Sequence, residues 1–419
     1  MYIELTNVSL KEAVMNKWVF AGIACITAAV AVTGCAGTKA YVDPDGPKIA
    51  AYIRTWPLGS TAEAMAEGRH WSAKDVKAGY LTDMIVSFGH LKQENGVYTG
   101  DIYFPDIENK KTPFPDVWKN VAALKKTYPH LKVNVSFGGW GADGFSEVAA
   151  NDVKRGRFVS HITAFLKQYG LDGVDIDWEY PVGPDWGQEI SCQPADKENY
   201  LTLLRDIRSA LNSLGKETGK SYSLSVAVPA SSWYPQKIDV VALAAIVDSM
   251  KLMSYDYYGA WSAQTGHNAN LMNNPADPDW GGWSTDQAVR MYLDAGVPPE
   301  KLVLGLAFYG RAWKGAADNG VHGLYQKYTE AAYPDGLSWP DLQEFLKPES
   351  GYTRYWDDVA KAPFLYNGDI FISYTDEQQI AEIASYAAGK GLGGVMIWEY
   401  GHDVDAQLLK SLAESVSGK

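Results

Sequence analysis

Short runs of β-branched and aromatic residues recur along the chain from Lys48 onward, and polar, Gly or Pro residues bound each run. Runs of this length and composition predict buried β-strands. Eight strands are predicted, at Lys48–Trp56, Asp83–His90, Lys132–Trp140, Gly173–Tyr180, Ser223–Pro229, Met250–Tyr258, Lys301–Tyr309 and Gly394–Tyr400.

Apolar residues recur at helical spacing in the segments between these runs, and this pattern predicts amphipathic helices. The clearest are Trp118–Thr127, Arg155–Gln168, Lys197–Leu214, Thr285–Ala295 and Glu377–Lys390. Strands alternating with helices indicate an α/β fold, and eight such units indicate a (β/α)₈ TIM barrel. An open sheet with helices on both faces is the alternative, but no glycine-rich phosphate loop follows the first strand.

The segment between the seventh and eighth predicted strands is too long for a single helix. Residues from about 314 to 368 are rich in Gly, Pro, Tyr and polar residues and lack clear helical periodicity. We expect a small α+β insertion between strand 7 and helix 7 of a barrel that spans residues 48–419. An insertion after a barrel strand lies at the C-terminal face, where it would form one wall of a cleft.

The N-terminal region has the pattern of an export signal. Lys17 precedes an apolar run at residues 18–32, and the run ends in Val-Thr-Gly followed by Cys35. This ending resembles the bacterial lipobox, in which the cysteine is lipidated. We expect upstream sequence at residues 1–14, a signal peptide ending at residue 34, and a tether at residues 35–47. Plain secretion and a membrane anchor are the alternatives, although the run is shorter than the roughly 20 residues of a membrane span.

This pattern predicts a protein outside the cytoplasm, either a cell-envelope lipoprotein of the periplasm or outer membrane or a secreted protein. A lipid on Cys35 would then be its only membrane attachment. Cys25 and Cys35 lie in the leader region, so Cys192 is the only other cysteine and no internal disulfide is expected. We expect a monomer that folds on its hydrophobic core.

Charge and composition exclude some classes of partner. The chain of 419 residues has 37 basic and 50 acidic side chains, and its net charge of -13 argues against nucleic acid. Aromatic residues make up 13% of the chain, with 15 Trp and 26 Tyr. These side chains could fill the core or line a groove, and composition leaves both open.

Three carboxylates on one predicted strand are the main candidate for chemistry. In the segment DGVDIDWEYP, side chains alternate, so Asp175, Asp177 and Glu179 share one face and point into the barrel. Like charges in a desolvated row are costly. A structural role would need neighbouring cations, which this segment lacks. A metal site and a catalytic array are the two alternatives to a structural role, and in an array the row would raise the pKa of Glu179.

Four motifs together resemble those of the glycoside hydrolase family 18 chitinases. DGVDIDWEYP is similar to the D-G-x-D-x-D-x-E signature, and the Ser-Phe-Gly-Gly-Trp run at 136–140 resembles the S-x-G-G motif. The Met-Ser-Tyr-Asp run at 253–256 resembles the M-x-Y-D motif, and Trp398 matches the tryptophan at the end of the eighth strand. The resemblance covers residues 48 to about 405.

The resemblance implies a barrel glycosidase that needs no cofactor and retains the anomeric configuration by substrate assistance. Glu179 would protonate the leaving oxygen while the N-acetyl carbonyl of the substrate attacks the anomeric carbon. Asp177 would hydrogen-bond the acetamido N–H, Asp175 would share a proton with Asp177, and Tyr255 would bind the acetamido oxygen. Residues on one strand lie too close together to flank a sugar, which agrees with a nucleophile supplied by the substrate.

Further residues are candidates for sugar contacts. Trp398 would be the floor under the reacting sugar, with a buried core tryptophan as the alternative. The polar candidates are Asp256 and Arg311, for which a surface ion pair is the alternative. The remaining groove candidates are Tyr52, Gly139, Trp140 and Met253, and some of Trp186, Trp233, Trp261, Trp280, Trp283 and Trp313 should line further subsites. Glu399 follows Trp398 directly and should point away from the barrel interior.

The sequence therefore predicts a chitinase that acts on β-1,4-linked N-acetylglucosamine. An endo-β-N-acetylglucosaminidase acting on N-glycans shares the carboxylate motif and is the close alternative. A chitin-binding lectin is the alternative from another class, although the proton donor Glu179 is present. The seven His show no metal-ligand spacing, and no metal site is expected.

Overall fold

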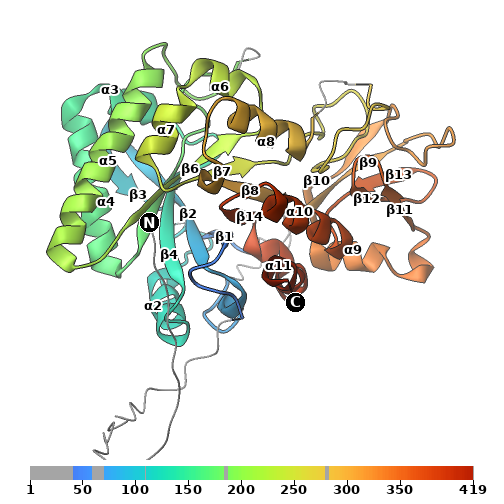
Figure 1. Ribbon diagram of the computed structural model, residues 1–419, viewed down its shortest axis with the longest axis horizontal. Helices are drawn as coiled ribbons and strands as arrows, with labels where there is room; N and C mark the ends of the chain where they lie inside the picture. The colour runs from blue at the N-terminus through green and yellow to red at the C-terminus, as the bar shows by residue number, and fades with distance from the viewer. Residues whose placement is uncertain (1–40, 59–69, 109, 184–186, 279–282, 419) are drawn as a thin grey trace, which may run out of the picture. The chain divides into compact units, whose positions relative to one another are not determined.

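The structure is a computed structural model that describes residues 41–58, 70–108, 110–183, 187–278 and 283–418 (Figure 1). The predicted signal peptide, the lipidation of Cys35, and the loop residues Trp186 and Trp280 lie outside these ranges. Of the predicted tether, residues 41–47 are described. Within this segment Val42 is buried and the Tyr41 ring stacks on Tyr80, so the end of the tether packs on the folded chain.

A closed barrel of eight parallel strands forms the centre of the fold. In chain order its strands are β1 (Lys48–Arg54), β2 (Asp83–Glu94), β4 (Lys132–Gly138), β5 (Gly173–Asp177), β6 (Ser223–Pro229), β7 (Ser249–Met253), β8 (Leu302–Ala307) and β14 (Gly394–Trp398). β1 pairs in parallel with both β14 and β2, which closes the sheet. The predicted (β/α)₈ barrel is confirmed.

Helices surround the barrel on the side away from its interior (Figure 1). They are α2 (Val117–Thr127), α3 (Phe145–Ala150), α4 (Asp152–Tyr169), α5 (Asp196–Thr218), α6 (Trp233–Lys237), α7 (Val240–Ile246), α8 (Thr285–Asp294), α10 (Glu377–Gly389) and α11 (Gln407–Ser417). Side-chain caps set several of the starts: Asn151 accepts from two backbone N–H groups of α4, and Ser284 and Asp376 cap α8 and α10.

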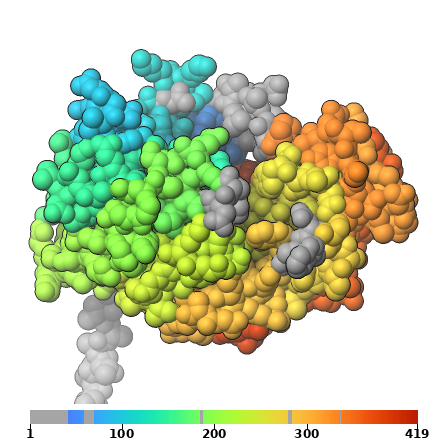
Figure 2. Space-filling view, turned by 90° about the horizontal axis from the view of Figure 1, so that it is seen from above, coloured from blue at the N-terminus to red at the C-terminus, as the bar shows by residue number. Residues whose placement is uncertain are grey.

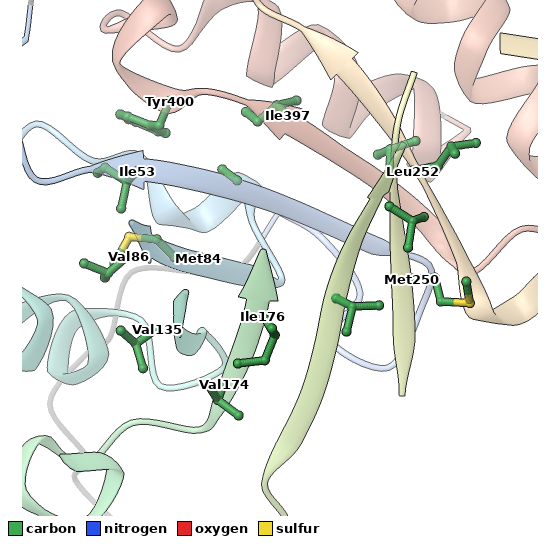
Figure 3. Packing of buried hydrophobic residues seen from close by; sticks show 14 of the residues in the cluster. Ile53, Met84, Val86, Val135, Val174, Ile176, Met250, Leu252, Ile397 and Tyr400 are labelled. Carbon is green, nitrogen blue, oxygen red and sulfur yellow. The ribbon is translucent and has the colours of Figure 1, made fainter. Parts of the chain in front are cut away.

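The main hydrophobic core lies between the barrel strands and these helices (Figure 3). Val174 and Ile176 on β5 are fully buried there, as are Met250 and Leu252 on β7. Because side chains alternate along a strand, the residues between them face the barrel interior. The apolar half of the carboxylate strand therefore packs under the helices, and its acidic half faces inward.

The predicted strands are too long at several C-terminal ends. β5 ends at Asp177 and β7 ends at Met253, so Glu179 and Tyr255 lie just beyond the paired backbone. The aromatic residues that follow have high β-propensity, and propensity alone does not show where hydrogen-bonded pairing stops. These residues consequently emerge at the C-terminal mouth of the barrel.

A five-stranded antiparallel sheet and one helix are inserted between β8 and α10. The strands lie in the order β10-β9-β13-β12-β11. Their bounds are β9 (Tyr309–Lys314), β10 (Glu330–Ser338), β11 (Thr353–Asp357), β12 (Ala362–Tyr366) and β13 (Ile370–Ser373), and the helix is α9 (Trp339–Phe345). The sheet begins before residue 314 and ends after residue 368, because β9 follows β8 after a single residue and merges with its apolar run.

One further hairpin was not predicted. β2 continues past the barrel to Glu94 and pairs in antiparallel fashion with β3 (Val97–Tyr103). The turn between them contains Asn95 and Gly96, both with positive φ. An Asn-Gly turn between two strand-like runs is a hairpin signal that the sequence did carry.

Candidate active site

A cavity opens at the C-terminal ends of the barrel strands. It has a volume of about 170 Å³ and is lined by Tyr52, Phe88, Trp140, Asp177, Glu179, Ala227, Met253, Tyr255, Asp256, Met396 and Trp398. Each of these residues belongs to a barrel strand or lies within three positions of its end. Figure 2 shows one face of the molecule, hollowed between the green segments that follow β5 and the yellow and orange segments of the second half of the chain.

The cavity brings together most of the predicted site residues, and three of them lie outside its lining. Asp175 is completely buried. Gly139 has a φ of 93°, and a Cβ there would approach the Phe88 ring to 2.8 Å, so this glycine allows the cavity wall to close. Arg311 reaches the site through an ion pair with the lining residue Asp256.

Asp175 lies in a shell of hydrogen-bond donors that come from four other strands. Its Oδ2 accepts from Tyr52 Oη at 2.8 Å and from Ser136 Oγ at 2.7 Å. Its Oδ1 accepts from Ser225 Oγ at 2.6 Å and from Lys251 Nζ at 2.8 Å. Burial opposes the ionisation of Asp175, but the charge of Lys251 and these hydrogen bonds outweigh it and lower its pKa.

Lys251 is the main residue around the acidic row that was not predicted from the sequence. No cation lies in the acidic segment itself, but β7, two strands away in the sheet, supplies one. Side-chain alternation could have shown that Lys251 faces inward, because Met253 was expected in the groove and Lys251 precedes it by two positions on the same strand. Lys251 therefore faces the barrel interior, where it is 3% exposed.

The environments of Asp177 and Glu179 raise the pKa of these carboxyls, whereas that of Asp175 lowers its pKa. Asp177 is 5% exposed, and its Oδ1 has no hydrogen-bond partner among the described residues. Burial, followed by the charges of Glu179 and Asp175, raises its pKa well above the usual range. Burial also raises the pKa of Glu179 to about 7, with a further contribution from the charge of Asp256. A carboxylic acid with such a pKa can donate a proton near neutral pH.

A second polar cluster surrounds Asp256, which follows β7. Asp256 Oδ1 accepts hydrogen bonds from Tyr309 Oη at 2.6 Å and from Arg311 Nε at 2.7 Å. Burial and nearby charged and phenolic groups raise the pKa of Tyr255, so its hydroxyl stays neutral and can donate a hydrogen bond. The Arg311 guanidinium also lies 4.8 Å from the centre of the exposed Trp261 ring.

Aromatic rings form the floor of the cavity. Trp398 stacks on Phe88, with ring centres 5.6 Å apart and planes 21° apart, and contacts Tyr52 at the same centre distance. Trp56 packs against the same group from outside the cavity lining. Trp140 is 73% exposed and presents an apolar face to solvent. A flat ligand with apolar faces and polar edges matches this surface.

The other loop tryptophans differ in how far their side chains are buried. Trp233 and Trp313 are buried in the core, at 7% and 0% exposure, so neither offers a surface to a ligand. Trp283 is half-buried against an aromatic cluster, and Trp261 is 63% exposed. Glu399 is buried outside the cavity lining, where it accepts from the Gly401 N–H at 2.8 Å.

The described residues contain neither a metal-binding cluster nor a membrane-spanning helix. Within the ranges given above, no group of three or more His, Cys, Asp or Glu is arranged to hold a metal ion. In the same part of the chain, no helix combines the length and apolarity needed to cross a bilayer.

The chain is similar to known glycosidases over most of its length. Residues 48–403 match the family model described as "Glycosyl hydrolases family 18". Chitinase A1 of Niallia circulans is 35% identical over 416 residues, covering 88% of this chain and 58% of that protein. Chitinase 1 of Aphanocladium album is 32% identical over 406 residues, covering 92% and 90%. This chain thus spans little more than half the length of the first relative and most of the second.

Two solved structures extend the comparison to the fold. A family 18 N-acetylglucosaminidase from Paenibacillus barengoltzii is 34% identical with a TM-score of 0.74, covering 88% of this chain and 100% of that one. Chitinase ChiA74 from Bacillus thuringiensis is 30% identical with a TM-score of 0.77, covering 89% and 70%.

Proposed function

The chain belongs to family 18 of the glycosyl hydrolases, and from that membership we propose that it cleaves β-1,4-linked N-acetylglucosamine in chitin or chitooligosaccharides. The observation that carries the proposal is the environment of Glu179. This residue is a cavity acid whose pKa is raised to about 7, and it is set beside Asp177 and above an aromatic floor. The chitinase names of the relatives support the same substrate class.

We propose that Glu179 begins the reaction by protonating the glycosidic oxygen. The acetamido carbonyl oxygen of the substrate attacks the anomeric carbon as the bond to the leaving sugar breaks, and an oxazolinium ion forms. Asp177 accepts a hydrogen bond from the acetamido N–H, and Tyr255 donates its hydroxyl to the acetamido oxygen. Both contacts hold the nucleophile in line with the anomeric carbon.

In the second half of the reaction Glu179 is a carboxylate and acts as the base. It accepts a proton from water, which attacks the anomeric carbon and opens the oxazolinium ring with net retention of configuration. Besides Asp177, which binds the acetamido N–H in this scheme, Asp256 is a further carboxylate in the cavity lining, but it is held by Arg311 and Tyr309. We therefore assign the nucleophile to the substrate and not to a second carboxylate, in contrast to the usual pair of acids.

Product analysis tests the proposal. The protein is incubated with chitin oligomers, with an N-glycan and with a cellulose oligomer of matched length. We expect new reducing ends from the chitin oligomers alone, with the β-anomer as first product. Efficient cleavage of the cellulose oligomer would contradict substrate assistance, because glucose lacks the acetamido group. Cleavage of the N-glycan core instead would identify an endo-β-N-acetylglucosaminidase.

Exo action is a second candidate, because one of the similar structures is that of an N-acetylglucosaminidase that this chain covers completely. The same assay distinguishes the two. Single N-acetylglucosamine units released from one end indicate exo action, and a mixture of internal products indicates endo action. Binding of oligomers without any cleavage would identify a lectin.

We also propose that the protein is exported and lipidated at Cys35. The support is the apolar run ending in Val-Thr-Gly-Cys. Labelled palmitate should enter the wild-type protein and not a Cys35→Ser variant, and the wild-type protein should fractionate with membranes. A soluble, unlabelled wild-type protein would contradict the proposal.

A further inference from the structure

Below the cavity, Lys251 and Asp175 form an ion pair that the barrel encloses. The Lys251 Nζ lies 2.8 Å from Asp175 Oδ1, and the two side chains are 3% and 0% exposed. The same ammonium group donates to Ser225 Oγ and lies 6.0 Å from the centre of the Tyr52 ring. Since Ser225 and Tyr52 also donate to Asp175, the lysine belongs to the shell around that carboxylate.

The hydrogen bonds of this shell disfavour the protonation of Asp175. Its two oxygens already accept four hydrogen bonds, from Tyr52, Ser136, Ser225 and Lys251. A protonated carboxyl would have to displace one of these donors or turn one of the hydroxyl groups from donor into acceptor. It would also leave the ammonium of Lys251 buried without its counter-charge, which is strongly unfavourable.

Asp177 differs from Asp175 although the two share a strand face. Its Oδ1 is buried, and no described residue forms a hydrogen bond with it, so a charge on this oxygen is not compensated by these residues. The titratable groups facing the two aspartates are Lys251 from β7, Glu179 beyond β5 and a set of tyrosines. These are Tyr52 from β1, Tyr180 beyond β5, Tyr200 from α5, Tyr234 from α6 and Tyr255 beyond β7. Lys251 is the cation among them, and it is paired with Asp175.

We propose that Lys251 is a positioning residue that keeps Asp175 as a permanent anion and so confines the mobile proton of the acidic row to Asp177 and Glu179. This inference rests on the proposed function and deepens it. It replaces the sequence-based expectation that Asp175 and Asp177 share a proton. Lys251 acts through Asp175 and does not line the cavity.

The proton balance of the reaction then involves two groups. When Glu179 gives its proton to the leaving oxygen, the neutral Asp177 beside it can donate a hydrogen bond to the new carboxylate. The other oxygen of Asp177 remains free to accept the acetamido N–H. No proton has to leave the row, because Asp175 stays charged against Lys251 throughout.

Carboxyl NMR tests the inference without any substrate. Protein labelled with ¹³C at aspartate carboxyls is titrated as wild type, Lys251→Met and Lys251→Arg, and the Asp175 signal is assigned by its loss in Asp175→Asn. We expect the wild-type Asp175 signal to be constant between about pH 4 and pH 8, and to titrate in that range in Lys251→Met because the uncompensated buried carboxylate takes up a proton. Lys251→Arg should restore the constant signal.

The pH profile of kcat/KM on chitin oligomers is the second readout. Removing a buried cation raises the pKa of the remaining carboxyls, so the acidic limb of Lys251→Met should move up by about one pH unit or more. Leu252→Val is the matched control, because Leu252 is buried on the opposite face of the same strand and should leave the profile in place. An Asp175 signal and an acidic limb that are both unchanged in Lys251→Met would overturn the inference.

Two other outcomes can be distinguished from a failure of this inference. If the wild type does not cleave chitin oligomers, the proposed function fails, whereas the NMR titration still decides the protonation of Asp175. If Lys251→Met does not fold, the double variant Lys251→Met with Asp175→Asn removes both charges. Recovery of folded protein in that variant supports the ion pair, and no recovery contradicts it.

Discussion

The guanidinium of Arg311 lies 2.6 Å from Asp256 Oδ1 and joins the inserted sheet to the barrel. Arg311 belongs to β9, whereas Asp256 follows β7 and lines the cavity. The insertion is therefore part of the site, because one of its strands holds a cavity carboxylate in place. Tyr309, at the start of the same strand, donates to the same oxygen.

Replacing Arg311 by Ala should weaken substrate binding more than it slows chemistry. The variant frees Asp256 to move and removes the group that covers the Trp261 ring. We expect KM for chitin oligomers to rise about tenfold, the equivalent of roughly 1.4 kcal/mol, with a smaller change in kcat. Steady-state kinetics measure both. Lys314→Ala is the control, since Lys314 is exposed on the same strand and pairs with the surface residue Glu330. Equal effects in both variants would contradict the assignment.

Replacing Glu179 by Gln should abolish cleavage and leave oligomer binding intact. The amide keeps the shape of the side chain but cannot transfer a proton, and general acid catalysis typically contributes about 10²- to 10⁴-fold. Single-turnover kinetics and calorimetric binding to a chitin oligomer measure the two effects separately. Glu414→Gln makes the same substitution at an exposed position on α11 and should behave as wild type. Persistent turnover in Glu179→Gln would assign the proton donor elsewhere.

The raised pKa of Glu179 predicts how both the activity and the stability of the protein depend on pH. Activity should fall as pH rises through about 7, because the acid loses its proton. A carboxyl whose folded pKa exceeds its unfolded value holds its proton more tightly in the folded state. Stability from this group is therefore present at low pH and is lost as pH rises from about 4.5 through about 7. Glu179→Gln should gain in Tm relative to wild type over that interval, as thermal melts at pH 4 and pH 8 would show. A constant difference in Tm would contradict the raised pKa.

Asp357 should show the opposite pH dependence. It accepts hydrogen bonds from Val359 and Ala360 N–H at 3.0 Å each, and its Oδ2 lies 3.1 Å from His267 Nε2. Burial opposes ionisation, but the hydrogen bond and charge of His267 prevail and lower the pKa of Asp357 to about 2. Its stabilisation is present above the unfolded pKa near 3.9 and is lost as pH falls through about 2.

Asp357→Asn should therefore lower the Tm at pH 7 and have little effect near pH 2. The Asp357 carboxylate links the loop after β7 to the inserted sheet. Loss of such charged hydrogen bonds lowers the free energy of unfolding by about 1.5–3 kcal/mol. Asp358→Asn is the matched control, because that neighbour is 83% exposed. Equal melting temperatures of the two variants at pH 7 would show that the loop does not depend on this contact.

The fold was largely predictable because its signals are local. Short β-branched and aromatic runs located all eight strands, and helical spacing of apolar residues placed the main helices within a few residues. Strand ends were less accurate, as at Glu179 and Tyr255, because pairing with a neighbour decides where a strand stops. The inserted sheet was predicted as a region but not as strands, since its antiparallel pairings join segments far apart in the sequence.

The site was predictable where residues share one strand and less so where they meet across the barrel. The acidic row could be read from alternation in a single segment. Lys251 could not be paired with Asp175 in that way, because the two lie 76 positions apart, on strands that are separated by β6 in the sheet. The pairing of Arg311 with Asp256 similarly depends on how the insertion folds back over the cavity.

The pairing of β1 with β14 has a consequence for biosynthesis. Tyr52 comes from the first barrel strand and Trp398 from the last, and their rings are in contact. A nascent chain that has not yet reached Gly394 exposes unpaired edges on β1 and β8 and lacks the floor of the cavity. Completion of the ligand cavity is thus a late event, and shortening the chain by its last strand would remove the binding surface and the closure of the barrel together.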